Sequence, residues 1–123
     1  KAKESVDGKW SIPGGWADIG YTPSEIVKKE IEEETGLVTE VDRLLAVYDK
    51  RCYQHPPQPF YVYKFVFLCT VKNGGLRHGF DMEDTTFFDI DNLPELSEDR
   101  ILKSQIKQLY KLALDETAEV YFD

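Results

Sequence analysis

The segment from Thr22 to Gly36 carries the start and stop signals of a helix, and it constrains the fold more than any other stretch of the chain. Thr22 is a good N-cap, Pro23 suits the first helical position, and Glu25 completes a capping box. Gly36 provides a left-handed stop at the other end. The sequence therefore predicts one helix over residues 23–35.

Strands are expected on both sides of this helix. Asp7-Gly8 is a hairpin signal with residues 9–12 as the returning strand. The outgoing strand would then lie before Asp7, where little sequence remains, so we expect further sequence upstream. Residues 60–71 are nearly all apolar, which favours a central strand buried on both faces.

The remaining elements complete a layered domain. We expect further strands over residues 42–49 and 85–90, and a second helix from Ser97 to Leu114 with an apolar stripe along one side. Strands and helices mixed at these spacings predict an α/β/α layered fold, with residues 1–123 forming a single domain.

Charge and hydropathy exclude two classes of partner. The net charge is −8, so the chain offers no basic surface of the kind that binds nucleic acid. The longest apolar run, 60–71, is too short to cross a membrane and contains Lys64. Cys52 and Cys69 have neither metal-ligand nor redox spacing. We therefore expect two reduced thiols, no nucleic-acid or membrane partner, and a cytoplasmic location.

Glutamates crowd the first helix. At about 100° per residue, Glu30, Glu33 and Glu34 fall on the same half of the helix as Ile26, whereas Glu32 falls on the opposite half. Carboxylates roughly 6 Å apart repel by about 3 kcal/mol per pair at an effective dielectric of about 20, or on the order of 8 kcal/mol for three pairs. A divalent cation removes this repulsion, and hard oxygen ligands favour Mg²⁺ or Mn²⁺. The pattern predicts a metal site; the alternative is a solvated or lysine-paired face.

The loop before the helix supports a metal or phosphate site. Gly14-Gly15 lets the backbone approach a ligand closely and can present an uncovered carbonyl group. Two glycines alone indicate little, but here they directly precede an acidic helix.

Taken together, these residues resemble the signature of the Nudix hydrolases. The family pattern is a glycine, five residues, a glutamate, seven residues, then Arg-Glu, an aliphatic residue, one residue, Glu-Glu, one residue, glycine and an aliphatic residue. Gly15 starts the pattern in this chain, and Glu30, Glu33-Glu34 and Gly36 follow at the same spacing. The resemblance implies a Nudix-type α/β/α sandwich with a mixed β-sheet.

Two positions depart from the signature. Tyr21 stands where the family has its first glutamate, and Lys29 stands where it has arginine. In the family these two positions are thought to form an ion pair that joins the loop to the helix. Their joint replacement is expected to be one structural exchange.

The resemblance also implies the chemistry of the site. Glu30, Glu33 and Glu34 would bind Mg²⁺ or Mn²⁺, with the Gly15 carbonyl as a further ligand. Water would attack a phosphorus atom of a diphosphate bridge, which gives a nucleoside monophosphate and a phosphorylated partner. Glu33 and Glu34 would therefore be catalytic residues.

The general base is expected on the signature helix or on a later acidic loop. The candidates on the later segment are Asp81, Glu83 and Asp84, of which Glu83 is favoured. Trp16 is expected to stack on a nucleobase and Arg51 to contact phosphate, with packing and simple solvation as their alternatives.

Other segments, including His55-Pro56-Pro57 and residues 93–100, resemble a bacterial branch with an extra helical N-terminal domain. Members of that branch hydrolyse ADP-ribose or CDP-choline type substrates, often as dimers. The resemblance thus implies a nucleotide substrate and a homodimer. Two other functions stay open: a sanitising hydrolase for nucleoside triphosphates, and a non-catalytic module that senses a nucleotide sugar.

Overall fold

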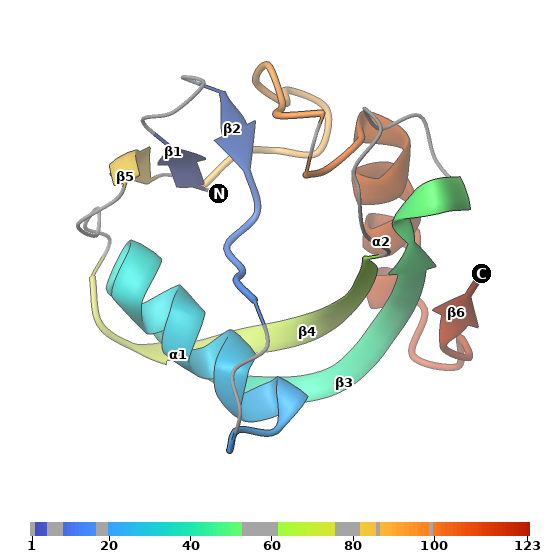
Figure 1. Ribbon diagram of the computed structural model, residues 1–123, viewed down its shortest axis with the longest axis horizontal. Coiled ribbons are helices and arrows are strands. Elements are labelled where there is room, and N and C mark those ends of the chain that lie inside the picture. Colours follow the sequence, from blue (N-terminus) through green and yellow to red (C-terminus); the bar gives the residue numbers. More distant parts are fainter. Residues whose placement is uncertain are drawn as a thin grey trace.

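The computed structural model describes residues 2–4, 9–16, 20–52, 62–75, 82–85, 87–98 and 100–123. Its described strands form two three-stranded sheets with the orders β2-β1-β5 and β4-β3-β6. The elements (Figure 1) are β1 (Ala2–Glu4), β2 (Trp10–Ser11), α1 (Pro23–Thr35), β3 (Val38–Asp49), the 3-10 helix η1 (Lys50–Cys52), β4 (Tyr63–Asn73), β5 (Met82–Thr85), α2 (Lys103–Leu114) and β6 (Tyr121–Phe122).

The sheet built on β3 is mixed. β3 pairs antiparallel with β4 and parallel with β6, and both helices contact β3. α1 lies along the first part of the curved β3–β4 hairpin and α2 lies at its other end (Figure 1). The predicted α/β class with a mixed sheet is thereby confirmed.

Helix α1 has the predicted bounds and both predicted caps. The Thr22 hydroxyl oxygen accepts from the Glu25 N–H at 3.3 Å, and the Glu25 carboxylate accepts from the Thr22 N–H at 3.0 Å. The latter bond holds the pKa of the Glu25 carboxyl below its usual range. Gly36 ends the helix at φ 81°, a left-handed conformation. Local sequence alone therefore defines this helix.

The hairpin signal at Asp7-Gly8 lies outside the described residues, but its two strands are present. β1 pairs antiparallel with β2, with Ala2 opposite Ser11 and Lys3 opposite Trp10. The outgoing strand is therefore supplied by residues of this chain.

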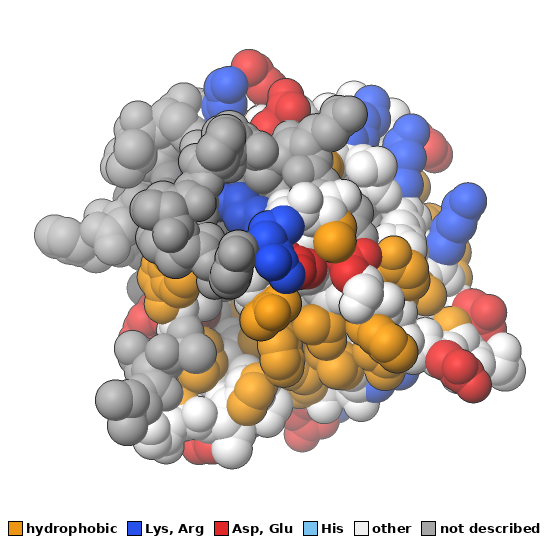
Figure 2. All heavy atoms as spheres, turned by 45° about the vertical axis from the view of Figure 1, so that its right-hand side comes forward, with side chains coloured by type: hydrophobic (Ala, Val, Ile, Leu, Met, Phe, Trp, Pro, Cys, Tyr) orange, Lys and Arg blue, Asp and Glu red, His pale blue; other side chains and the backbone are white. Residues whose placement is uncertain are grey.

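Strand β4 differs from its expectation of a central strand buried on both faces. It lies at the edge of the described β4-β3-β6 sheet, and the Tyr63 and Phe65 side chains are 60% and 50% exposed. Phe122 of β6 is 72% exposed on the same sheet. Figure 2 views the molecule from the side of α2 and β6, and it shows hydrophobic side chains gathered on this surface. Val66 and Leu68 of the apolar run pack against the cluster that joins β3 to α2, whereas large side chains such as Tyr63 stay exposed.

The strand expected over residues 85–90 lies earlier, at Met82–Thr85. Its backbone pairs with β1, which places Thr85 opposite Ala2. Phe88 follows the strand and packs edge-on against Trp10, with 4.8 Å between ring centroids. Phe88 therefore serves core packing and does not extend the strand, whereas Phe87 is 66% exposed.

Helix α2 begins later than the expected cap at Ser97. The Ser97 N–H donates to the Trp10 carbonyl oxygen at 2.7 Å, and the Ser97 carbonyl accepts from the Ile101 N–H at 2.9 Å. Ser97 is almost fully buried by these contacts. The helix starts instead at Lys103, where the Gln105 side chain accepts from the Leu102 N–H at 3.0 Å. A long-range contact with β2 thus overrides the local capping signal.

The C-terminal strand β6 was not expected from sequence. Tyr121 and Phe122 pair with Ala46 and Val47 of β3, and the Asp49 N–H donates to the Asp123 carboxylate at 2.9 Å. Only the short β-prone run at the C-terminal end signals this strand. None of the helices in the described part of the chain is long and apolar enough to cross a membrane.

Two apolar clusters hold the elements together. One joins β3 to α2 through Leu45, Ala46, Tyr48 and Leu109. The other joins α2 to the segment before it, and its buried members are Leu96, Ile101 and Ile106. Tyr48 is fully buried, and its hydroxyl donates to Gln108 Oε1 at 2.7 Å. Burial raises the pKa of Tyr48 to about 12. Tyr48 is thus a core residue, as strand packing predicts.

Arg43 ties β3 to the end of α2. One guanidinium nitrogen, Nη2, donates to three carbonyl oxygens at the helix C-terminus, those of Leu112 (2.6 Å), Ala113 (3.4 Å) and Asp115 (3.0 Å). A cation at this end also opposes the negative pole of the helix dipole. The contact joins the C-terminal end of α2 to β3.

We expect Arg43→Met to lower the free energy of unfolding by about 2 kcal/mol, because charge-assisted bonds to three helix-end carbonyls are lost. Urea denaturation measures the change. Lys72→Met is the matched control, since Lys72 forms an exposed ion pair with Glu40 at 3.4 Å and its loss should cost well under about 1 kcal/mol. Equal effects of the two substitutions would contradict the role assigned to Arg43.

Candidate metal and nucleotide site

The Glu30 carboxylate lies directly against the backbone of Gly15. A Cβ built on Gly15 would stand 2.6 Å from the Glu30 carboxyl carbon and 2.8 Å from Oε1. These distances are shorter than any ordinary contact, so a larger residue at position 15 would displace the carboxylate. Gly15 is therefore required for close approach, as the sequence predicts.

Glu34 joins the same loop one residue earlier. Its Oε2 accepts a hydrogen bond from the Gly14 N–H at 3.0 Å. The pair Gly14-Gly15 was singled out from sequence, but only the structure shows that Gly14 acts through its N–H group. Two carboxylates from successive turns of α1 thus meet the glycine loop that runs beside the helix (Figure 1).

Glu33 lies away from this meeting point. Its side chain is 57% exposed, and Oε1 stands 3.8 Å from the Lys29 ammonium. The same ammonium lies 5.3 Å from the centre of the Tyr21 ring. A cation–π contact therefore occupies the two positions at which this chain departs from the signature.

The helix-wheel expectation thus holds for two of the three glutamates. Glu30 and Glu34 are half-buried, whereas Glu33 is exposed and paired with a lysine. Glu32 is exposed, as the wheel predicts. Among the residues that the structure describes, no group of three or more His, Cys, Asp or Glu side chains is arranged to hold a metal ion. The structure therefore does not bring all three acids into the one cluster that the helix wheel predicted.

Trp16 and Arg51 lie in different surroundings. Trp16 follows Gly15 directly in the glycine loop, and its side chain is 68% exposed. Arg51 lies in η1, at the far end of β3 from α1 (Figure 1). Its Nη2 donates to the Asp49 carboxylate at 2.6 Å, which holds the pKa of Asp49 below its usual range. The structure brings Trp16, and not Arg51, to the glycine loop.

The candidate general bases lie on or before β5. Glu83 and Asp84 belong to this strand, and β5 contacts α1. Asp81 lies outside the described residues, and the structure describes only the backbone of β5. Glu83 as the base therefore stays a prediction.

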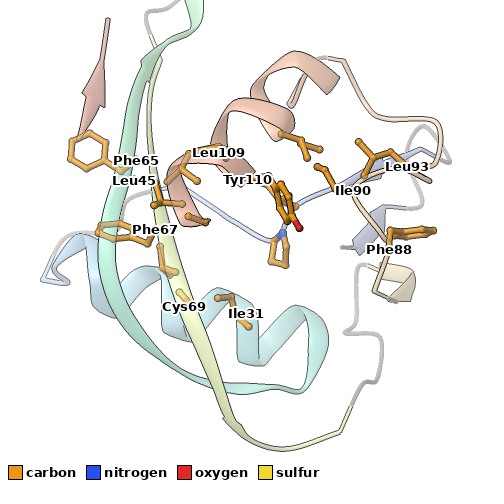
Figure 3. A pocket seen from close by; sticks show the side chains of 16 residues that line it. Ile31, Leu45, Phe65, Phe67, Cys69, Phe88, Ile90, Leu93, Leu109 and Tyr110 are labelled. Carbon is orange, nitrogen blue, oxygen red and sulfur yellow. The ribbon is translucent and has the colours of Figure 1, made fainter. Parts of the chain in front are cut away.

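An apolar cavity of about 400 Å³ opens between α1, the β3–β4 hairpin and α2. Pro13, which precedes the glycine loop, and Ile31, which follows Glu30, both line it. Figure 3 shows lining side chains from the hairpin, from α2 and from the segment before α2, namely Leu45, Phe67, Cys69, Leu109, Tyr110, Ile90 and Leu93. Sequence patterns did not indicate this cavity, because it forms between elements far apart in the chain.

The chain is similar to known proteins over nearly its whole length. "Putative ADP-ribose pyrophosphatase YjhB" of Bacillus subtilis (strain 168) is 40% identical over 121 residues, which are 98% of this chain and 58% of that protein. "ADP-ribose pyrophosphatase" of Methanocaldococcus jannaschii is 38% identical over 102 residues, which are 81% of this chain and 59% of that protein. The crystal structure of a UDP-X diphosphatase superposes with a TM-score of 0.89 at 40% identity, covering 99% of this chain and 59% of that one.

This chain thus spans about three fifths of the length of each of these proteins. The comparisons do not support the expected extra N-terminal domain. The NUDIX domain family matches residues 1–110, which carry the glycine loop, α1 and the strands around them. The similarity, the fold and the signature residues agree, and the chain belongs to the Nudix family.

Proposed function

We propose that this chain is the Nudix domain of a metal-dependent pyrophosphohydrolase that cleaves the diphosphate bridge of a nucleoside diphosphate joined to another moiety. The observation that carries the proposal is the meeting of the Glu30 and Glu34 carboxylates with the Gly14-Gly15 backbone. The names of the relatives, an ADP-ribose pyrophosphatase and a UDP-X diphosphatase, support this substrate class.

The donor set suits a small hard dication. Nudix hydrolases generally use divalent metal ions. Mg²⁺ is held in proteins by one or two carboxylates and completes its shell with waters and substrate phosphates. Glu30 and Glu34 provide two carboxylates against a bare backbone, and the exposed Glu33 lies one turn along the helix from Glu30. We propose that these three glutamates and the Gly15 carbonyl hold Mg²⁺ or Mn²⁺.

When bound, the metal would neutralise the diphosphate and lower the pKa of an attacking water. The chain's own groups then position the substrate. Trp16 offers an exposed aromatic face for a nucleobase, and the apolar cavity beside Pro13 offers a second surface that excludes water. The proposed catalytic residues are Glu33, Glu34 and Glu83. Among them Glu83 is favoured as the general base that accepts a proton from the attacking water.

The finer substrate and the assembly are also proposals. ADP-ribose and UDP-linked compounds are favoured by the relatives' names, whereas the CDP-choline type rests on the sequence resemblance. The homodimer and the phosphate contact of Arg51 likewise stay predictions. Hydrolysis of nucleoside triphosphates and nucleotide sensing without turnover are the alternatives.

A substrate panel separates these functions. The protein is incubated with ADP-ribose, a UDP-sugar, CDP-choline and a nucleoside triphosphate, each with Mg²⁺ or with EDTA, and the products are resolved by chromatography. The proposal expects a nucleoside monophosphate and a phosphorylated partner from one of the first three, only with Mg²⁺. Preferred turnover of the triphosphate would favour the sanitising alternative. Substrate binding without turnover would favour the sensor.

Substitution of Glu34 tests the carboxylate that reaches the loop. Glu34→Gln keeps an oxygen that can accept from the Gly14 N–H but removes the charge, so we expect the fold to persist and kcat/KM to fall by at least about 100-fold. Glu32→Gln, on the exposed side of α1, is the matched control and should stay within about twofold of the wild type. Similar losses in both variants would refute the assignment.

Substitution of Gly15 tests the close approach itself. An alanine methyl at position 15 would overlap the Glu30 carboxylate, whereas a methyl at Gly14 would meet nothing within 4 Å. Neither glycine has a positive φ, so both substitutions suit the backbone. We expect Gly15→Ala to weaken Mn²⁺ binding by roughly 10-fold at an unchanged melting temperature, because Glu30 swings aside. Gly14→Ala should bind Mn²⁺ like the wild type, and equal Mn²⁺ affinities of the two variants would contradict the site.

A further inference from the structure

We propose that the apolar cavity between α1, the β3–β4 hairpin and α2 is a binding site for an uncharged aromatic or aliphatic group. The described residues that line it carry no charged side chain, and their polar side-chain groups are the Tyr110 hydroxyl and the Cys69 thiol (Figure 3). The cavity volume of about 400 Å³ lies within the range of small-molecule sites, roughly 300–1,000 Å³.

The lining of the cavity is in contact with solvent. Leu45, Ile106 and Leu109 are buried, whereas the other lining residues are half-buried or exposed. Phe65 and Tyr110 are the most open of them, at 50% and 46% exposed. Water beside such a wall finds few hydrogen-bond partners, so an apolar group that displaces this water is favoured.

The shortage of polar groups in the lining selects the chemistry of the ligand. A sugar has several hydroxyl groups, and each one that is buried without a partner carries a desolvation penalty. The Tyr110 hydroxyl and the Cys69 thiol are too few to satisfy them. A carboxylate or a phosphate would lose its hydration without gaining a cation from the described lining. The cavity therefore suits a group with few polar atoms and no charge.

The cavity shares a wall with the candidate metal site. Val27, Ile31 and Glu34 are spaced i, i+4 and i+7 along α1, so they lie on one face of the helix. Val27 and Ile31 line the cavity. The Glu34 carboxylate accepts from the Gly14 N–H, and Pro13, directly before Gly14, lines the cavity as well. A group in the cavity thus adjoins the loop at which the metal is proposed to bind.

Two kinds of molecule carry this chemistry. One is a separate small apolar molecule, and the other is a substrate in which the moiety joined to the nucleoside diphosphate is itself apolar. Binding of a free apolar molecule does not depend on the metal site, whereas assignment of the cavity to the substrate rests on the proposed function.

Protection of Cys69 from a small neutral thiol reagent reports whether the cavity is occupied. Burial raises the pKa of the Cys69 thiol, which lines the cavity, whereas Cys52 is exposed in η1 and serves as a control within the same chain. We expect saturating 5-fluoroindole to slow the reaction of Cys69 with methyl methanethiosulfonate by at least about fivefold and to leave the rate at Cys52 unchanged. Mass spectrometry of the two peptides measures both rates. Equal effects on the two thiols, or no effect on either, would overturn the proposal.

Filling the cavity tests its location. Ala113→Phe adds a ring at a lining position of α2 and should weaken 5-fluoroindole binding, followed by ¹⁹F NMR, by at least about 10-fold. Leu114→Phe, at a neighbouring position that is 67% exposed, is the matched control and should bind like the wild type. Cys69→Leu, with Val71→Leu as its control on the same strand, makes the same comparison from β4 if Ala113→Phe does not fold. Equal affinities of a filling variant and its control would contradict the site.

Competition for bound 5-fluoroindole identifies the source of the group. The 2-phenylethyl ester of UDP is compared with 2-phenylethanol and with UDP, each with Mg²⁺ and before hydrolysis sets in. Stronger competition by the ester than by the alcohol assigns the cavity to the substrate, and equal competition assigns it to a separate small molecule. Competition by neither, or by UDP as strongly as by the ester, would overturn an apolar site. Absence of turnover across the substrate panel would instead refute the proposed function and leave the binding of 5-fluoroindole unchanged.

Discussion

The close contact between a side-chain carboxylate and a bare backbone organises this molecule. Glu30 stands where a Cβ of residue 15 would be, and Glu34 bonds the preceding N–H, so α1 and the glycine loop are joined along two turns of the helix. The contact requires glycine on one side and a well-defined helix on the other. The capping box at Thr22 and the left-handed Gly36 provide that helix independently of its surroundings.

The acidic side chains on α1 contact different neighbouring groups. The net charge is −8, and three acids of the helix have different neighbours: Glu30 faces the Gly15 backbone, Glu34 accepts from Gly14, and Glu33 lies near Lys29. Two of these acids, Glu30 and Glu34, are thereby directed at one loop.

The rest of the fold supports the site from a distance. β3 contacts both helices, and Arg43 fixes the end of α2 against it. β6 adds a parallel neighbour to β3. Members of both apolar clusters, Leu109 and Ile106 among them, line the cavity together with Ile31 of α1. The cavity thus forms between α1, the β3–β4 hairpin and α2, which are packed through separate contacts.

The sequence by itself determined α1, its caps, the spacing of its glutamates and the family, because these depend on residues close together in the chain. It misjudged β4 as central, the strand near residue 88, and the start of α2 at Ser97. Contacts between residues distant in sequence explain these differences. The Phe88 ring packs against Trp10, and the Ser97 N–H donates to the Trp10 carbonyl oxygen. Among the described strands, none pairs with the outer edge of β4. Only the tertiary structure decided that Gly14 contributes its N–H, that Glu33 pairs with Lys29, and that a cavity opens beside the loop. The direction of a side chain and the gaps between packed elements depend on contacts between distant residues, and a local sequence pattern does not contain them.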